Sequence, residues 1–380
     1  MPSSIEILDK LIAFDTVSRT PNRGLIDYIR TLLDEAGIDS MLVEDPDGHC
    51  ANLYATVGPD DKGGVMLSGH TDVVPVAGQA WTVDPFTMTE RGGRLYGRGT
   101  TDMKGFVACA IHAAIAAAKR PLSTPLHLAF SYDEEIGCVG VRRLLDILET
   151  APVKPAMCIV GEPTELVVAN GHKGKTAARA ACTGKSVHSA LAPTGVNAIQ
   201  VAAAFIAMLQ EMQAEIATSA TRDDAYDIPY TTIHPGIIAG GTALNIVPNE
   251  CLVDFEVRNI QSDDPDTIFR QIKEAADKIA VSFGEDAGIG IEIVNSYPGL
   301  DTPLDADVVR FVQSLTGANS TTKLAFGTEG GLFSTQVGIP TVVCGPGSMA
   351  QGHKPDEFIT VDQMAKCDGM LSALLDRLAA

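Results

Sequence analysis

The chain has 380 residues, a mass of 40.0 kDa, 45% hydrophobic residues, a formal net charge of -20 and a pI near 4.7. A chain of this length exceeds what one hydrophobic core usually serves, so we expect two domains. The acidic charge, with no run of Lys or Arg, argues against nucleic acid and anionic membranes as partners, because such surfaces repel an acidic protein.

The sequence also carries information about the compartment. The N-terminus lacks the basic start and continuous apolar stretch of a signal peptide, and no later segment is apolar for long enough to span a bilayer. Eight cysteines are scattered along the chain without a CxxC pair, several of them inside apolar runs. This usage is typical of reduced, buried thiols rather than of disulfides or a thiolate zinc site. We therefore expect a cytoplasmic protein.

Predicted helices and strands alternate through the first part of the chain. Apolar spacing predicts helices at 4–18, 22–36, 103–119 and 138–149, and strands at about 40–44, 52–57, 64–70, 126–132 and 156–161. Alternation of this kind is typical of a sheet covered by helices on both faces.

The pattern changes near residue 174. It then predicts a half-exposed strand in KTAARAACTG, a helix at 195–217, a strand in ECLVDFEVR and a helix at 264–282. The first pattern returns with a helix at 304–315, strands in KLAF and IPTVVCG, and a helix at 361–378 that Thr360 caps. We expect an α/β domain with a mixed, mostly parallel sheet, formed by residues 1–174 and 298–380. A smaller α+β domain, residues 175–297, interrupts it.

Polar side chains recur where the apolar strands end. They are His70 and Asp72 after VMLSG, Asp102 in GRGTTDMKG, Asp133, Glu134 and Glu135 after LHLAFSY, Glu162 after MCIVG, and His353 in GHKPDEF. Ligands bind at the carboxyl edge of an open α/β sheet, so these residues should converge there. Two histidines among four or five carboxylates suit zinc or a similar metal, with one carboxylate too many for a single catalytic ion. We therefore expect a pair of metals that share a bridging carboxylate.

Each of these residues also has an ordinary structural interpretation. His70 could be a hydrogen-bonded histidine at a strand end, and Asp102 could be the N-cap of the following helix. Glu134 and Glu135 could be solvated charges in a turn, and Glu162 could be a loop residue. Their joint recurrence after successive core strands favours the shared site.

Several longer motifs resemble a known family. These are SGHTDVVPV, GRGTTDMKGF, DEEIGCVG, GEPTE, GGTALNIVPNE and CGPGSMAQGHKPDEFI, in this order. They resemble the dinuclear zinc amidohydrolases, which include acetylornithine deacetylases, succinyl-diaminopimelate desuccinylases, aminoacylases and glutamate-releasing carboxypeptidases. The resemblance covers essentially the whole chain. It is closest to the acetylornithine deacetylases, through stretches such as FGTEGGLF and GIPTVVCGPGSMAQGHKPDEFI.

The resemblance implies two Zn²⁺ ions per subunit, for which Co²⁺ can substitute. One ion would be bound by His70, Asp102 and Glu162 and the other by Asp102, Glu135 and His353, with Asp102 bridging them. It also implies that Glu134 is the general base. A glutamate at position 162, as in GEPTE, matches the deacetylase, desuccinylase and aminoacylase branch, whereas related carboxypeptidases have aspartate there.

The chemistry of amide hydrolysis is consistent with these assignments. The reaction needs a nucleophile, stabilisation of the oxyanion and a proton for the departing amine. A metal-bridging water has a lowered pKa and supplies hydroxide, while the metals polarise the acyl carbonyl. Glu134 could take the water's proton and deliver it to the amine nitrogen. Asp72, two residues beyond His70, could accept the imidazole N–H and fix the tautomer that binds metal.

The inserted domain has implied roles as well. By resemblance it forms a lid and the interface of a homodimer, and His188 in GKSVHSA stabilises the oxyanion in the neighbouring subunit's site. Asn245 and Arg258 would hold the carboxylate of the substrate. The residues alone also allow a surface histidine at position 188 and a salt-bridged sheet arginine at position 258.

We expect a metal-dependent deacylase whose small-molecule substrate is an N-acyl amino acid. The preferred reaction converts N-acetyl-L-ornithine to acetate and L-ornithine, in arginine biosynthesis. The alternatives are another N-acyl amino acid, a succinyl-diaminopimelate or a dipeptide, or a non-catalytic protein that binds amino-acid derivatives. The base beside a complete metal set argues against the last. For ornithine-type substrates we hypothesise that Glu329, in FGTEGGLF, faces the side-chain ammonium; a capping or solvated glutamate is the alternative.

Overall fold

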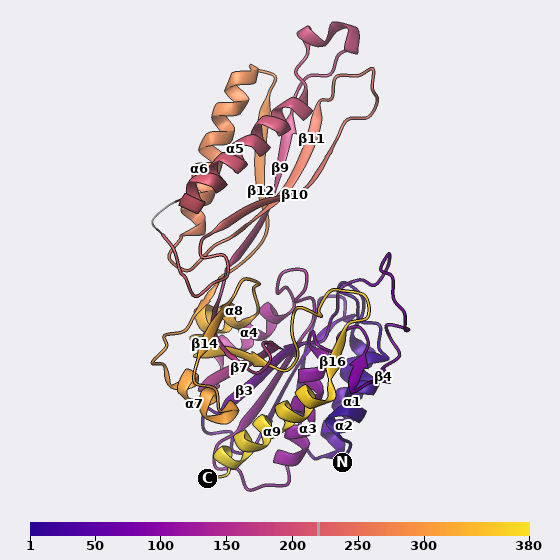
Figure 1. Cartoon of the computed structure of the whole chain (residues 1–380), viewed down its shortest axis with the longest axis vertical. Coiled ribbons are helices and arrows are strands. Elements are labelled where there is room, and N and C mark those ends of the chain that lie inside the picture. The colour runs from indigo at the N-terminus through magenta and orange to yellow at the C-terminus, as the bar shows by residue number, and fades with distance from the viewer. Residues whose placement is uncertain (219–220) are drawn as a thin grey trace. The chain divides into compact units, whose positions relative to one another are not determined.

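The computed structural model describes residues 1–218 and 221–380, and the chain forms two compact units. Unit 1 contains Met1–His172, Leu300–Leu324 and Thr328–Ala380, whereas unit 2 contains Lys173–Gly299 and Ala325–Gly327. Both chain termini therefore belong to unit 1 (Figure 1).

Unit 1 is built on a mixed β-sheet with the strand order β1-β2-β6-β3-β7-β15-β8-β13, and β14 pairs with β8. The strands are β1 (Ser40–Glu44), β2 (Ala51–Val57), β3 (Val65–His70), β6 (Leu126–Ser131), β7 (Met157–Pro163), β8 (Val168–His172), β13 (Leu300–Asp301), β14 (Thr321–Leu324) and β15 (Thr341–Gly345). The central strands β6, β3, β7 and β15 are parallel, so their carboxyl ends lie at one edge. The predicted α/β class with a mixed sheet is confirmed.

Helices pack on both faces of this sheet (Figure 1). They are α1 (Ser4–Ile12), α2 (Arg23–Glu35), α3 (Lys104–Ala117), α4 (Val141–Thr150), α7 (Asp307–Thr316), α8 (Gly330–Leu332) with the following η2 (Phe333–Val337), and α9 (Val361–Leu378). Side chains alternate along a strand, so Val65 and Leu67 of β3 join a cluster with α1, α3 and α9, while Met66 is buried on the other face. The small side chains of the Ala-rich α3 allow it to pack closely among these elements.

Several segments of unit 1 differ from the sequence prediction; strands β8 and β13 and the helical turns α8 and η2, for example, were not predicted. The helix predicted at 4–18 ends at Ile12, because the chain beyond it pairs with the segment that follows β3: Val17 bridges Val73, and the Ser18 amide donates to the Val73 carbonyl. A small sheet, with the order β16 (Phe358–Thr360), β5 (Arg94–Tyr96), β4 (Thr89–Arg91), was not predicted. The predicted cap of the last helix is confirmed, since Thr360 Oγ1 accepts from the Gln363 amide at 3.1 Å.

Unit 2 is an antiparallel sheet covered on one face by two helices (Figure 1). Its strand order is β10 (Thr232–Gly240), β11 (Glu250–Arg258), β9 (Lys175–Thr183), β12 (Gly288–Tyr297), and its helices are α5 (Ala198–Thr218) and α6 (Pro265–Phe283). Alternate residues of β11, from Cys251 to Val257, are buried against the helices. This α+β architecture matches the predicted second domain type.

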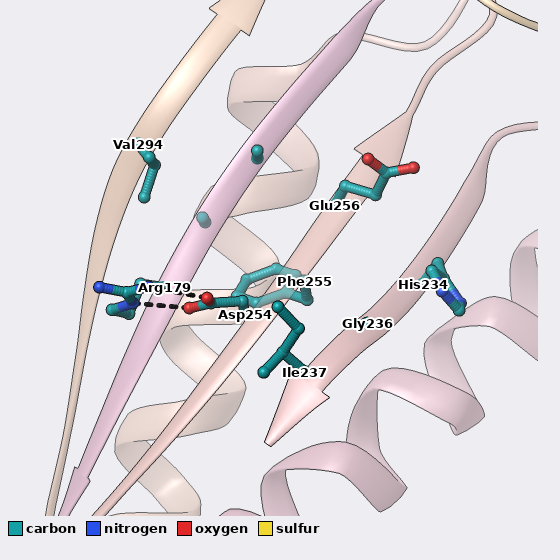
Figure 2. A pocket seen from close by; sticks show the side chains of 10 residues that line it. Arg179, His234, Gly236, Ile237, Asp254, Phe255, Glu256 and Val294 are labelled. Carbon is teal, nitrogen blue, oxygen red and sulfur yellow. Dashed lines mark hydrogen bonds and ion pairs between the residues drawn. The ribbon is translucent and has the colours of Figure 1, made fainter. Parts of the chain in front are cut away.

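The other face of the unit 2 sheet carries a shallow pocket (Figure 2). Arg179 on β9 forms two hydrogen bonds with Asp254 on β11, of 2.6 and 2.8 Å. Ile237 and Val294 add exposed apolar surface beside this pair. The open face is thus mixed in polarity, unlike the apolar face beneath the helices.

All eight cysteines are free and buried, as their positions in apolar runs predicted. Within residues 1–218 and 221–380, no helix has the length and apolar character needed to cross a membrane.

Candidate metal centre

The five predicted metal ligands converge at the carboxyl edge of the unit 1 sheet. His70 ends β3 and Glu162 lies near the end of β7, whereas Asp102 precedes α3, Glu135 follows β6 and His353 follows β15. One set of ligand atoms comes from His70, Asp102 and Glu162, and a second from Asp102, Glu135 and His353. Within each set all ligand atoms lie within 4.8 Å of one another. The arrangement forms two adjacent sites with one shared residue.

Asp102 occupies the position between the two sets. Its Oδ1 lies 3.1 Å from His70 Nε2, and its Oδ2 lies 3.0 Å from His353 Nε2. The second histidine is also 3.0 Å from Glu135 Oε2, while Glu162 Oε1 is 3.7 Å from His70 Nε2. A carboxylate with one oxygen toward each set is suited to bridge two cations. Imidazole nitrogens and carboxylate oxygens are ligands that zinc accepts, so the residues fit two divalent ions.

The positive groups of the protein do not fully compensate the negative charge of the buried carboxyl groups. Burial, followed by the charge of Asp102, raises the pKa of Glu135 to about 7. The same two causes, with the charge of Glu134, raise the pKa of Glu162 well above its ordinary value. Four acidic side chains thus share this small volume, and divalent cations would supply the missing charge.

The two histidines act as counter-ions for these carboxylates. Hydrogen bonds to Asp102 and Glu135 raise the pKa of His353 to about 10. Burial lowers the pKa of His70, but the hydrogen bond and charge of Asp102 outweigh it and leave the pKa well above its ordinary value. Since only a neutral imidazole binds metal, ion binding must release these protons.

The Asp72 carboxylate makes contacts that differ from the predicted hydrogen bond to His70. His70 Nδ1 donates to the backbone carbonyl of Asp72 at 3.0 Å. The Asp72 carboxylate Oδ1 is 3.6 Å from the same nitrogen, which is too distant for a hydrogen bond. The carboxylate instead accepts from the amides of Glu134 and Glu135, at 3.0 and 3.3 Å, and from Ser18 Oγ at 2.7 Å. The backbone orients the imidazole, and the Asp72 side chain fixes the loop that carries both glutamates.

Glu134 lies beside the metal ligands without belonging to either set. Its side chain is largely buried, and its Oε1 accepts from the Cys138 thiol at 3.4 Å. Burial and the charge of Glu135 raise the pKa of its carboxyl well above the ordinary value, although the charge of His70 opposes this. A carboxylate with raised proton affinity beside a metal site has the properties of a general base.

The residues predicted to contact substrate in unit 2 lie in two places. His188 and Asn245 are exposed neighbours: His188 forms a bridge with Ile246, and the Ser189 amide donates to the Asn245 carbonyl at 2.9 Å. Arg258 is at the end of β11, where its Nε donates to Glu256 Oε1 at 2.7 Å. Arg258 is therefore a salt-bridged sheet residue in this structure, which was the alternative that the sequence allowed.

Glu329 is buried, so the alternative of a solvated glutamate is wrong. The residue is 2% exposed, and its Oε2 accepts from Ser68 Oγ of β3 at 3.3 Å. Ser68 and His70 project to the same side of their strand, so Glu329 packs under the metal centre. Burial raises its pKa to about 7, against the opposing hydrogen bond of Ser131 and the charge of His70. Contact with a substrate ammonium would require this side chain to move.

Two buried charged residues near the centre, Arg98 and Glu357, form an ion pair of 2.7 Å that was not predicted from the sequence. Only their positions next to proposed ligands could have identified them in the sequence. Arg98 precedes Asp102 within the Gly-rich GRGTTD, and Glu357 follows His353 within GHKPDEF.

Comparison with known proteins gives consistent matches over the whole chain. The profile of peptidase family M20/M25/M40 matches residues 66–377. The acetylornithine deacetylase of Myxococcus xanthus is 34% identical over 98% of this chain and 96% of its own length. That of Pasteurella multocida is 33% identical over 99% and 98%. The structure of an M20 family metallo-carboxypeptidase from Sulfolobus solfataricus aligns with a TM-score of 0.81 at 21% identity, covering 100% of this chain and 99% of the other.

Proposed function

The chain belongs to peptidase family M20/M25/M40. We propose that it is the hydrolase that converts N-acetyl-L-ornithine to acetate and L-ornithine. The observation that carries the hydrolytic function is the pair of ligand sets joined by Asp102. The choice of substrate is supported by relatives named acetylornithine deacetylase, at 34% and 33% identity over nearly the full chain. The reaction would be a cytoplasmic step of arginine biosynthesis.

The proposed cofactor is a pair of Zn²⁺ ions, with Co²⁺ as a substitute, bound by the two ligand sets. Once bound, such ions lower the pKa of a water between them and polarise the acyl carbonyl. The identity of the metal is part of the proposal, because imidazole and carboxylate ligands also accept other divalent ions.

Within the protein, we assign the proton transfers to Glu134. Its carboxylate would accept the proton of the attacking water and donate it to the amine nitrogen as the amide bond breaks. The raised proton affinity that burial gives this carboxyl suits both steps. Asp72 supports the assignment, since its hydrogen bond to the Glu134 amide limits the positions that the base can adopt.

Unit 2 is proposed as the lid and the interface of a homodimer, with the catalytic domain formed by residues 1–174 and 298–380 and the insertion by residues 175–297. We assign His188 to the oxyanion in the neighbouring subunit's site, and Asn245 and Arg258 to the substrate carboxylate. The exposure of His188 and Asn245 supports roles outside the core of unit 2. The planar guanidinium of Arg258 suits a carboxylate, although Glu256 now holds its Nε.

A ninhydrin assay of the amino groups released by zinc- and cobalt-loaded protein tests the proposal, because hydrolysis of each candidate substrate frees an amine. The panel contains N-acetylornithine, N-acetylmethionine, N-succinyl-diaminopimelate and a dipeptide, with metal-stripped protein as control. We expect the highest kcat/KM with N-acetylornithine and none without metal. A different preferred substrate would reassign the protein within its family, whereas binding without hydrolysis of any compound would favour the non-catalytic alternative.

A further inference from the structure

Glu357 is a buried carboxylate that binds the backbone of the segment carrying Asp102. Its side chain is 0% exposed. Oε1 accepts from the amides of Thr101 and Asp102 at 3.0 and 3.1 Å, and Oε2 accepts from the Gly99 amide at 3.0 Å. Hydrogen bonds from backbone amides to an ionised carboxylate are stronger than bonds between neutral groups. One side chain thus fixes the backbone on which the shared metal ligand is carried.

The same carboxylate is connected to the His353 segment by a short chain of contacts. Arg98 Nη1 donates to Glu357 Oε2 at 2.7 Å, and Arg98 Nη2 donates to Gln79 Oε1. Gln79 Nε2 in turn donates to the backbone carbonyl of His353 at 3.0 Å. The guanidinium also lies 5.0 Å from the ring centre of Trp81. Glu357 and Gln79 therefore connect the backbones of two metal ligands that are far apart in sequence.

These contacts are distributed unequally between the two ligand sets. His70 and Glu162 lie within the strands β3 and β7: His70 pairs with Ser131 of β6, and residues on either side of Glu162 pair with β15. Asp102, Glu135 and His353 all lie in loops, and the His353 backbone adopts a φ of 60°. Loop ligands depend on side-chain contacts for their position, since no ladder holds them. The set made up entirely of loop ligands should depend most on Glu357.

We propose that Glu357 is a positioning residue for the ion held by Asp102, Glu135 and His353. With Arg98 and Gln79, it fixes the separation of Asp102 and His353. The His70, Asp102 and Glu162 set shares only Asp102 with this network and should be affected less. The inference rests on the proposed two-metal site but not on the choice of substrate.

Metal titration of the full chain tests this inference. Metal-stripped Glu357→Gln and Gln79→Ala are titrated with Co²⁺, followed by its absorption spectrum and by competition with a chelator. Glutamine keeps the size of Glu357, so the substitution creates no cavity. It removes the charge and presents an NH₂ group to Arg98 or to the backbone amides, which should displace the segment that carries Asp102. We expect one ion to bind with nearly unchanged affinity and the other about 10- to 100-fold more weakly, with a smaller change in Gln79→Ala.

Asp376→Asn is the matched control, because it removes an exposed ion pair with Arg120 in the same unit. It should bind both ions as the wild type does. Equal weakening of both ions, or unchanged binding of both in Glu357→Gln and Gln79→Ala, would overturn the inference. If Glu357→Gln does not fold, the partly exposed Gln79→Ala decides, and unchanged binding there overturns it. Fewer than two ions bound by the wild type would refute the proposed metal site, and the inference with it.

Discussion

At the scale of single residues, the contacts of Asp72 predict a different effect of its substitution from the one that the sequence suggested. Its carboxylate binds the amides of Glu134 and Glu135 and leaves the His70 imidazole to a backbone carbonyl. Asp72→Asn retains one acceptor oxygen, so the loop with the base should shift while His70 stays in place. We expect kcat/KM to fall about 10- to 100-fold with a smaller effect on metal content. Metal analysis beside the deacetylation assay measures both.

A matched variant, Ser18→Ala, removes only the third hydrogen bond to the same carboxylate. It should lower activity less than Asp72→Asn does. Loss of metal as the main effect of Asp72→Asn would instead support the original assignment of this side chain to His70.

The adjacent glutamates should separate catalysis from metal binding. Glu134→Gln removes the proposed base outside both ligand sets, so we expect both ions to remain while kcat falls about 10²- to 10⁴-fold. Glu135→Gln removes a ligand oxygen and should lower metal content. Atomic-emission metal analysis with single-turnover kinetics distinguishes the two variants, and full activity in Glu134→Gln would refute the assignment.

Glu329 is expected to act on all substrates alike. It packs under the centre against Ser68 and is 2% exposed, so it is out of reach of a substrate side chain. Glu329→Gln should therefore change kcat/KM for N-acetylornithine and N-acetylmethionine by the same factor. A loss confined to N-acetylornithine would restore the hypothesis that this carboxylate contacts the ammonium group.

At the scale of elements, the loop before η1 (Ser189–Thr194) carries the proposed intersubunit contact. His188 is its exposed N-cap, where Nδ1 accepts from the Ala190 amide at 3.1 Å, so Nε2 is the nitrogen free of that bond. If His188 acts in the neighbouring subunit, His188→Ala and Glu134→Gln protein should each be nearly inactive. Mixing them should restore activity, because each heterodimer then contains one complete site.

The measurement is activity after subunit exchange, with light scattering to establish the dimer. Mixing Glu134→Gln with Asp102→Asn is the control. Both residues lie in unit 1 of the same subunit, so neither site of the heterodimer is complete and activity should not recover. No recovery in the His188 mixture, with exchange demonstrated, would place this histidine outside the neighbouring site.

At the scale of the whole molecule, the charges in unit 1 predict how pH affects the metal-free protein. Glu135 and Glu329 have pKa values raised to about 7, so folding favours their neutral forms, and this contribution is lost as pH rises through that value. The pKa of His353 is raised to about 10, so its contribution also declines between its ordinary value and pH 10. The metal-free protein should therefore lose thermal stability between about pH 6 and pH 9.

Calorimetry of metal-free and zinc-loaded protein across this range checks the prediction. Bound ions compensate the carboxylates and require neutral imidazoles, so the loaded protein should gain stability relative to the metal-free form as pH rises. A metal-free Tm that increases between pH 6 and pH 9 would contradict the assigned directions.

Sequence patterns alone predicted the α/β class, the order of the main helices and strands, and a group of strand-end polar residues, among which the family resemblance selected the five proposed ligands. They could do so because apolar periodicity marks core strands, and because the parallel order of those strands brings their carboxyl ends to one edge. His70 and Glu162 were visible for this reason, since each directly follows buried residues of a strand.

Only the tertiary structure decided which groups hold these residues in place. The sequence placed Asp72 near His70, but the partner of its carboxylate depends on β6, which ends more than fifty positions later. The network of Glu357, Arg98 and Gln79 and the burial of Glu329 likewise arise from contacts between distant segments. Local patterns determine where a strand ends, whereas hydrogen-bond partners and burial depend on the packing of the whole unit, so the chain alone could not reveal them.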